Sequence, residues 1–182
     1  MSSSKSRPIL LVDGYNVIGA WPSLCQKRDN VGMEEARREL TESLVNYSAF
    51  EGLDIRIIFD AHYQDTPSLN EKVTDGVLLH YTGFGQTADT YIEKTCATLA
   101  RKIKILKGRL IVATSDRAQR LTVVGYGAEW LSAEQLATVV EHSTRSCQRR
   151  HKSNKRPANR SLANSLDPEA QKRLAMLRMG LQ

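Results

Sequence analysis

Residues 9–16 read Ile-Leu-Leu-Val-Asp-Gly-Tyr-Asn, and this stretch decides the fold. Its first four residues form a short aliphatic run between Pro8 and Gly14, which is the pattern of a strand buried in a parallel sheet. Open parallel sheets place their ligands at the carboxyl ends of their strands. The strand therefore delivers the carboxylate of Asp13 and the amide of Asn16 to the edge where a substrate would bind.

Two further strands are predicted to end at an aspartate. Residues 54–59 lead into Asp60, and residues 110–114 lead through Ser115 into Asp116. One aspartate at a strand end is commonly a helix N-cap or a turn residue, and that interpretation stays open for each of them. Three acidic strand ends in one small domain nevertheless suggest a site for a cation.

The rest of the chain alternates between strand and helix patterns. Apolar residues at three- and four-residue spacing predict helices, and short aliphatic runs predict strands. The alternation predicts an α/β fold in which helices cover both faces of a mostly parallel central sheet. The last helix of this domain opens with the capping pattern Ser132-Ala133-Glu134-Gln135. In addition to the strands above, we expect strands at 77–81 and 129–131, helices at 33–50, 88–107, 117–123 and 132–147, and loops at 21–32 and 61–74.

The composition is that of a soluble globular protein. The 182 residues are 41% hydrophobic and 25% charged, which suits one domain of ordinary size with an appendage. The first apolar run stops at Asp13 and is too short for a signal-peptide core or a membrane span. The three cysteines are widely spaced without a Cys-x-x-Cys pair, which argues against a zinc site. We therefore expect a cytoplasmic protein that does not associate with membranes.

The net charge of +6 conceals a strong asymmetry. Residues 145–182 contain ten Lys and Arg against two Asp and Glu, whereas residues 1–144 contain sixteen against eighteen. A basic tail on a slightly acidic body indicates a polyanionic partner such as RNA, although basic tails also occur as solvated linkers. The candidate RNA-binding residues are Arg149, Arg150, Lys152, Lys155, Arg156 and Arg160.

The same change in composition predicts three parts. Residues 1–148 would form the α/β domain, and residues 149–166, which have almost no apolar content, would form a basic linker. Residues 167–182 predict a C-terminal amphipathic helix that begins with Asp167 as cap and Pro168 in the first turn.

A fourth aspartate, Asp89, lies in the first turn of the helix predicted at 88–107, with Glu93 one turn later on the same face. This helix also starts at the carboxyl edge of the sheet. Two carboxylates about 4 Å apart repel by roughly 1 kcal/mol in water and about 4 kcal/mol at an effective dielectric of 20. Mg²⁺ or Mn²⁺ would relieve this repulsion best, because the ligands are hard oxygens without a His or Cys set. The aspartates that can converge there, beside Asn16, are Asp13, Asp60, Asp89 and Asp116.

A competing motif lies just before that helix. Residues 83–88, Gly-Phe-Gly-Gln-Thr-Ala, match the dinucleotide-binding pattern G-x-G-x-x-A. However, Asp89 would place a negative charge beside the pyrophosphate, and about twenty residues further on the chain has Lys102 and Lys104 instead of an acidic ribose ligand. We therefore expect no nucleotide cofactor and interpret the glycines as a turn that lets the loop approach the site.

Four segments within residues 8–148 combine these features in one order. They read Leu-Val-Asp-Gly-Tyr-Asn-Val-Ile at 11–18, Phe-Asp-Ala-His at 59–62, Thr-Ala-Asp-Thr-Tyr-Ile-Glu at 87–93 and Ala-Thr-Ser-Asp at 113–116. In these segments the chain resembles the YacP-type, ribosome-associated endoribonucleases, which are NYN-domain proteins of the PIN-like superfamily. The resemblance implies a PIN-like three-layer α/β/α sandwich. It also implies metal-dependent cleavage of single-stranded RNA, with mRNA on the translating ribosome as the substrate.

The resemblance further implies which side chains form the site. Asp13, Asn16, Asp89 and Asp116 match its acidic core, and Asp60 matches as well. Asp13, Asp89 and Asp116 are expected to hold Mg²⁺ or Mn²⁺, directly or through water. Asn16 would orient Asp13 or a phosphate, and Asp60 and Glu93 would support the ligands or bind a second ion.

Two other functions remain open from the sequence. A non-catalytic factor that binds RNA or the ribosome could keep the same fold, although the presence of all four aspartates argues against it. A phosphatase-like hydrolase of the haloacid dehalogenase type would need Asp-x-Asp after the first strand, where this chain has Asp13-Gly14-Tyr15. The basic tail also suits a polymer better than a small metabolite. An RNA cleavage assay would separate these possibilities.

Overall fold

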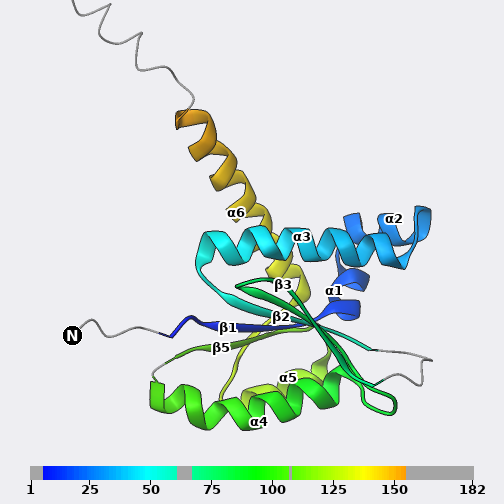
Figure 1. The fold of residues 1–182 in the computed structure, drawn as a ribbon, viewed down its shortest axis with the longest axis vertical. Helices are drawn as coiled ribbons and strands as arrows, with labels where there is room; N and C mark the ends of the chain where they lie inside the picture. The colour runs from blue at the N-terminus through cyan, green and yellow to red at the C-terminus, as the bar shows by residue number, and fades with distance from the viewer. Residues whose placement is uncertain (1–5, 61–66, 107, 155–182) are drawn as a thin grey trace, which may run out of the picture. The chain divides into compact units, whose positions relative to one another are not determined.

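One six-stranded sheet forms the centre of the fold (Figure 1). The computed structural model describes residues 6–60, 67–106 and 108–154. The strands lie in the order β3-β4-β2-β1-β5-β6, and among the described residues every neighbouring pair is parallel except β3 and β4. In chain order the strands are β1 (Ile9–Asp13), β2 (Asp54–Phe59), β3 (Leu69–Thr74), β4 (Val77–Tyr81), β5 (Leu110–Ala113) and β6 (Glu129–Leu131).

The helices cover both faces of this sheet. Side chains of α1, α2, α3 and the first turns of α6 share one core with the sheet, and α4 and α5 share a second core with its other face. The mixed α/β fold with a mostly parallel sheet is therefore confirmed. The helices are α1 (Gly14–Ala20), α2 (Pro22–Asn30), α3 (Met33–Glu51), α4 (Ala88–Leu106), α5 (Arg117–Gly125) and α6 (Ala133–Asn154).

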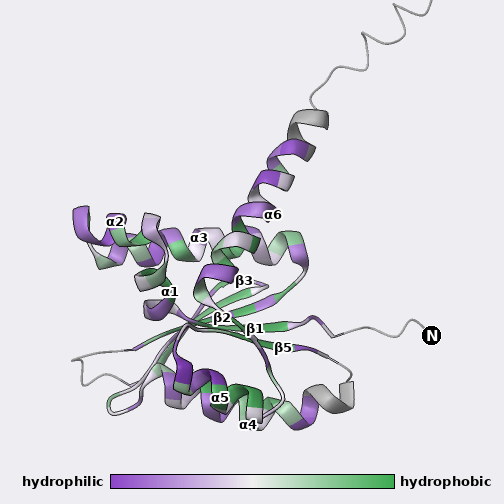
Figure 2. Cartoon of the chain, turned by 180° about the vertical axis from the view of Figure 1, so that it is seen from behind, coloured by the Kyte–Doolittle hydropathy of each residue, from purple (hydrophilic) through white to green (hydrophobic). Residues whose placement is uncertain are grey.

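Alternation along the strands separates the two cores. On β1, Leu10 and Val12 point into the core beneath α3, while Leu11 points into the core beneath α4. All three are at most 1% exposed, as a parallel strand covered on both faces requires. Figure 2 shows the central strands coloured mainly as hydrophobic, with hydrophilic positions on the helices around them.

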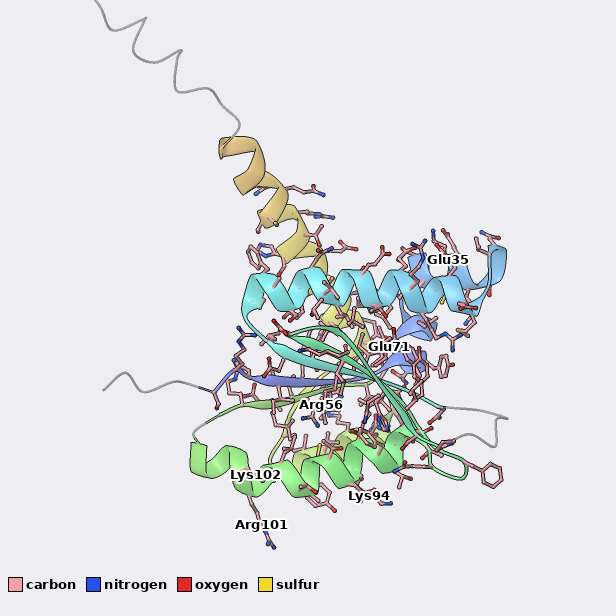
Figure 3. All side chains as sticks on the ribbon, viewed as in Figure 1. Glu35, Arg56, Glu71, Lys94, Arg101 and Lys102 are labelled. Carbon is pink, nitrogen blue, oxygen red and sulfur yellow. The ribbon has the colours of Figure 1, made fainter. Side chains whose placement is uncertain are left out.

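The two long helices bury narrow stripes. On α3, Ala36, Leu40 and Leu44 recur every four residues and are completely buried. On α4, Ala88, Ile92 and Cys96 do the same against the opposite face. The outer side of α4 is charged, and Figure 3 shows Lys94 and Arg101 projecting from it away from the sheet. No helix in the described ranges is long and apolar enough to cross a bilayer.

Three sequence predictions of local structure were wrong. Residues 21–32 were expected to form a loop, but α2 occupies Pro22–Asn30. Only Leu24 of α2 is buried, so the helix has no apolar period to detect. The loop expected at 61–74 contains the strand β3, all six residues of which are exposed, while residues 61–66 lie outside the described part.

The third difference concerns α6, which continues past its predicted end at Cys147 to Asn154. The basic stretch expected to begin a linker at residue 149 therefore begins inside a helix. Contacts divide the chain into residues 1–145 and 146–182, and each part is described by itself. The terminal helix predicted at 167–182 lies outside the described residues, so the three-part division stays a prediction.

Candidate functional site

The aspartates predicted from the sequence lie at the carboxyl edge of the sheet. Asp13 is the last residue of β1, and β1 lies between β2 and β5. Asp60 directly follows β2, and Asp116 follows β5 at the start of α5. Because these three strands are parallel, their carboxyl ends meet at one edge. The start of α4 contributes Asp89.

Three of these aspartates accept a backbone N–H from the start of a helix. The Oδ1 atom of Asp13 accepts the backbone N–H of Asn16 at 3.2 Å, and Oδ1 of Asp116 accepts the backbone N–H of Gln119 at 2.9 Å. Oδ1 of Asp60 accepts the backbone N–H of Ala88 at the start of α4. The capping interpretation is therefore confirmed for Asp13 and Asp116, whereas Asp60 bonds the start of a helix that lies 28 residues further along the chain.

Asp89 is different, because the start of α4 does not need it as a cap. Thr87 Oγ1 accepts the backbone N–H of Thr90 at 3.2 Å, and Asp60 accepts that of Ala88. The carboxylate of Asp89 instead accepts a hydrogen bond from the side-chain Nε2 of Gln119 at 2.5 Å. Asp89 is thus not needed to cap α4, and its carboxylate bonds to a residue in the first turn of α5.

The four carboxylates interact electrostatically. The pKa of Asp13 is raised from 3.8 to about 6, chiefly by burial and also by the charges of Asp89, Asp60 and Asp116, against the lowering effect of the Asn16 N–H. The pKa of Asp89 is also raised. Although the residue is solvent-exposed, its carboxylate is partly desolvated, and Asp116 and Asp60 add repulsion. Like charges held this close disfavour ionisation.

Asn16 connects two of the strand ends. Its Oδ1 accepts the backbone N–H of Ser115 at 2.7 Å, across 99 residues of sequence. The hydroxyl of Ser115 in turn donates to Glu134 Oε2 and accepts the backbone N–H of Ala133, both at 3.1 Å. This chain of bonds fixes the loop that carries Asp116 against α1 and the start of α6.

Glu93 lies toward a different group. Its Oε1 accepts the hydroxyl of Tyr126 at 3.5 Å, near the end of α5. The charges that raise the pKa of Asp13 and Asp89 come from the other aspartates. Sequence reasoning missed Gln119, whose side chain contacts the site; its only signal was its place three residues after Asp116, where a capping box often has Gln.

The donor set has the chemistry that Mg²⁺ and Mn²⁺ prefer. Its ligand atoms are carboxylate and amide oxygens, and a divalent cation would offset the repulsion that raises the pKa of Asp13 and Asp89. Within the described residues, however, no group of three His, Cys, Asp or Glu side chains stands in an arrangement that could hold a metal ion. The residues thus have the type of ligand atom that the cation prefers. Those described do not surround it completely with protein ligands.

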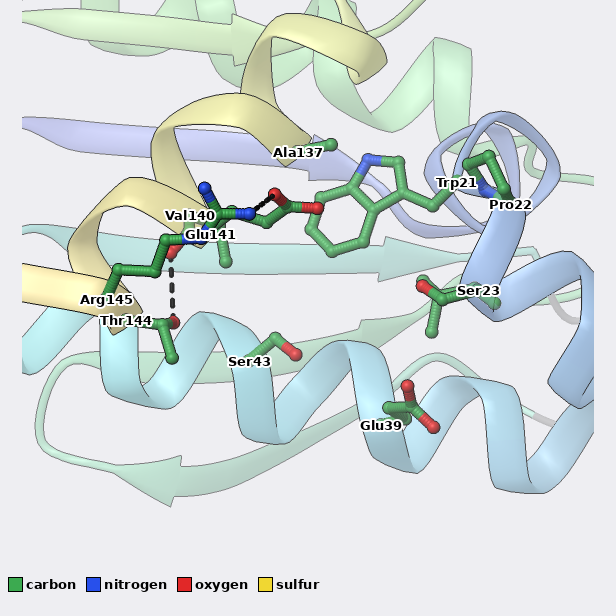
Figure 4. Close-up of a pocket in the computed structure, with 11 residues that line it drawn as sticks. Trp21, Pro22, Ser23, Glu39, Ser43, Ala137, Val140, Glu141, Thr144 and Arg145 are labelled. Atoms are coloured by element: carbon green, nitrogen blue, oxygen red, sulfur yellow. Dashed lines mark hydrogen bonds and ion pairs between the residues drawn. The ribbon is translucent and has the colours of Figure 1, made fainter. Parts of the chain in front are cut away.

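One cavity of the described part lies away from the aspartates. A cavity of about 490 Å³ opens between α2, α3 and α6, with Trp21, Ser43 and Val140 in its lining (Figure 4). None of the four aspartates lines it.

Only some of the candidate RNA-binding residues belong to the described part of the structure. Arg149, Arg150 and Lys152 belong to α6, and Arg149 is exposed. Lys155, Arg156 and Arg160 lie outside the described residues. Their role in binding stays a prediction.

Comparison with known proteins settles the family. Residues 10–179 match the sequence model of the YacP-like NYN domain. The chain belongs to the YacP-like NYN family. The match extends beyond residue 148, where the recognisable motifs end, and so includes the basic tail. NYN domains are nuclease-like, which supports an RNA-related function for this protein.

Individual relatives agree with this assignment. The chain is 38% identical over 143 residues to "Uncharacterized protein YacP" of Bacillus subtilis (strain 168), covering 78% of this chain and 80% of that protein. The crystal structure of Rae1 (YacP) from Bacillus subtilis matches with a TM-score of 0.66 at 33% identity, over 94% of this chain and 95% of that one. A mutant form of Rae1 matches with a TM-score of 0.69 at 31% identity, over 93% and 99%.

Proposed function

We propose that this protein is a metal-dependent endoribonuclease that cleaves single-stranded RNA, with mRNA on the ribosome as its substrate. The observation that carries the proposal is the gathering of four aspartates at the carboxyl edge of the sheet, where burial first and then repulsion from the other three raise the pKa of Asp13 to about 6. A protein gains no stability from such repulsion, so its retention is best explained by a cation and a phosphate that bind there.

Asp13, Asp89 and Asp116 are proposed to hold Mg²⁺ or Mn²⁺, some of them directly and others through water. Mg²⁺ keeps several waters and is usually held by one or two carboxylates together with substrate phosphates. A complete cage of three protein ligands is therefore not required, which agrees with the arrangement of the described side chains. When bound, such an ion would activate a water and stabilise the charge that develops on the phosphodiester.

The remaining residues act by holding these ligands in place. Asp60 fixes the first turn of α4 and so the position of Asp89. Asn16 fixes the loop at Ser115 and so the position of Asp116. Asp13 and Asp116 are each held by a backbone N–H and Asp89 by the side chain of Gln119, which limits their movement when a substrate binds.

The tail supports a long polyanionic substrate. Ten Lys and Arg in residues 145–182 would gather RNA phosphates that an acidic site alone would repel. We place the reaction in the cytoplasm, where mRNA and ribosomes meet.

One observation favours a second function. No three acidic side chains of the described residues are arranged to hold a metal ion. This favours a protein that binds RNA or the ribosome without cutting it. The two functions differ in whether RNA is cleaved, so a single assay separates them.

The test uses end-labelled single-stranded RNA with the full-length protein, with and without ribosomes, in Mg²⁺, Mn²⁺ or EDTA. We expect internal cuts that require the cation and are lost in Asp13→Asn, while the exposed control Asp75→Asn cuts like the wild type. Since water rather than the 2′-hydroxyl is the proposed nucleophile, RNA with a 2′-deoxy substitution at the cut should still be cleaved. RNA that is bound but stays intact in every condition would establish the binding factor instead.

A further inference from the structure

Gln119 touches two of the proposed ligands at once. It lies in the first turn of α5 and is 6% exposed. Its backbone N–H donates to Asp116 Oδ1 at 2.9 Å, and its side-chain Nε2 donates to Asp89 Oδ1 at 2.5 Å. One residue therefore links the start of α5 to the start of α4, across the site.

A glutamine at this helix position normally closes a capping box, by accepting the backbone N–H of the cap residue. Gln135 does this on α6, where its Oε1 accepts the N–H of Ser132 at 3.0 Å. On α5 the N–H of the cap residue Asp116 donates instead to Thr114 Oγ1 at 3.0 Å. Thr114 thus accepts the N–H that the glutamine of a capping box would accept. The side-chain amide of Gln119 can therefore bond to Asp89.

The second amide atom of Gln119 is the unusual one. Oε1 is buried and has no hydrogen-bond partner among the described residues. A buried acceptor left without a partner costs about 1–3 kcal/mol, so such atoms usually have a ligand or water to meet. The amide cannot simply be reversed, because Oε1 would then face the carboxylate of Asp89. The unpaired oxygen is therefore held beside Asp89 by the bond that Nε2 makes.

We propose that Gln119 is a positioning residue that holds Asp89 beside Asp116 before the cation binds and offers Oε1 to a water of the hydrated cation. This inference rests on the proposed function, since it concerns the same site. It explains why Gln119, which could close the capping box of α5, instead extends its side chain to Asp89. It also explains how a site without a complete set of protein ligands can be prepared for a hydrated ion.

The test compares Gln119→Met with Gln135→Met, which removes the matching glutamine from the capping box of α6. Met keeps the volume of the side chain but has neither amide atom. Binding of Mn²⁺ to the RNA-free full-length protein is measured by calorimetry, and cleavage is measured against Mn²⁺ and RNA concentration. We expect Gln119→Met to weaken Mn²⁺ binding about 10–100-fold, the usual effect of losing a group that orients metal ligands. The KM for RNA at saturating Mn²⁺ should stay the same, and Gln135→Met should bind Mn²⁺ like the wild type.

The possible outcomes separate the inference from the function. If the wild type binds Mn²⁺ and cleaves RNA while Gln119→Met binds Mn²⁺ equally well, Gln119 is a packing residue and the inference alone fails. Cleavage without Mn²⁺ binding to the RNA-free wild type would also overturn it. A wild type that neither binds nor cleaves would overturn the proposed function with it. Should Gln119→Met fail to fold, Gln119→Asn, whose shorter amide cannot span to Asp89, replaces it with the same expectations.

Discussion

Asp13 is the residue at which stability and the proposed activity oppose each other most directly. Its carboxyl has a pKa of 3.8 in the unfolded chain and about 6 in the folded protein, mainly because it is buried. Folding therefore favours the protonated form. The stability that this group contributes is complete below pH 3.8 and is lost as the pH rises through about 6.

We expect Asp13→Asn to be more stable than the wild type above pH 6, by on the order of 1–2 kcal/mol after allowance for solvent screening. Asn caps a helix as well as Asp and has no charge to desolvate. The same change should abolish RNA cleavage. Urea unfolding of both proteins across pH 3.8 to 6 and above measures the difference, and Asp75→Asn, at an exposed turn, should show no gain. Equal stability at every pH would mean that the site imposes no electrostatic cost.

Asp89→Asn separates a ligand from a structural residue. Thr87 and Asp60 already satisfy the first turn of α4, and an Asn oxygen can still accept the bond from Gln119. Because the pKa of Asp89 is raised, we expect stability without cation to be no lower than that of the wild type at neutral pH, together with a strong loss of cleavage. The thermal stabilisation by Mn²⁺, about 2.7 kcal/mol at 100 times the dissociation constant, should also be lost. A variant that melts earlier but cleaves normally would show that Asp89 serves the fold.

At this scale the sequence predicted the aspartates because strand ends and helix starts are visible in the pattern of apolar residues. Their place at one edge followed from the parallel sheet. Gln119 could not be predicted, because its partner depends on Thr114 taking over the cap, which is a contact between side chains rather than a pattern. The roles of the site residues in metal binding and catalysis stay predictions.

At the scale of elements, β1 and α1 meet at Gly14 without room for a side chain. A Cβ atom on Gly14 would lie 2.3 Å from the ring of Phe59. That ring is completely buried, with the rings of Tyr15 and Tyr81 at 5.2 and 5.7 Å between centroids. It therefore has little freedom to move aside.

We expect Gly14→Ala to destabilise the protein by about 1–3 kcal/mol, the usual cost of overfilling a packed core. Gly19→Ala is the matched control in the same helix, because nothing lies within 4 Å of its Cβ position. Ala there should be neutral or stabilise α1 by up to about 1 kcal/mol. Denaturant titrations of both variants measure this, and similar values for the two would refute the close approach at Gly14.

Elements with a strong apolar period were predicted closely. The bounds expected for the helices at 33–50 and 88–107 differ from those of α3 and α4 by one residue. The Ser132–Gln135 capping box is confirmed by two reciprocal bonds of 3.0 and 3.1 Å. By contrast, α2 and β3 bury almost nothing, and their positions are set by neighbours that the sequence pattern does not reveal.

For the whole molecule, the central problem is charge. The four aspartates would repel the phosphates of RNA, yet the substrate must lie across them. The excess of positive charge lies in residues 145–182, which follow all four aspartates in the sequence. If these residues bind RNA, affinity and cleavage belong to different parts of the chain, and each can be removed without the other.

Neutralising the tail to Gln should therefore weaken RNA binding at low salt and leave Mn²⁺ binding unchanged. If about five of the changed residues contact phosphates, the slope of log affinity against log salt should become shallower by about 3–4, at roughly 0.7 per contact for single strands. A control in which Lys94, Arg101 and Lys102 on the outer face of α4 become Gln tests for a general effect of net charge. Equal slopes for the tail variant and the wild type would mean that the tail is a solvated segment, and RNA would then have to be held by the α/β domain alone. The residues changed in the tail are Arg149, Arg150, Lys152, Lys155, Arg156 and Arg160.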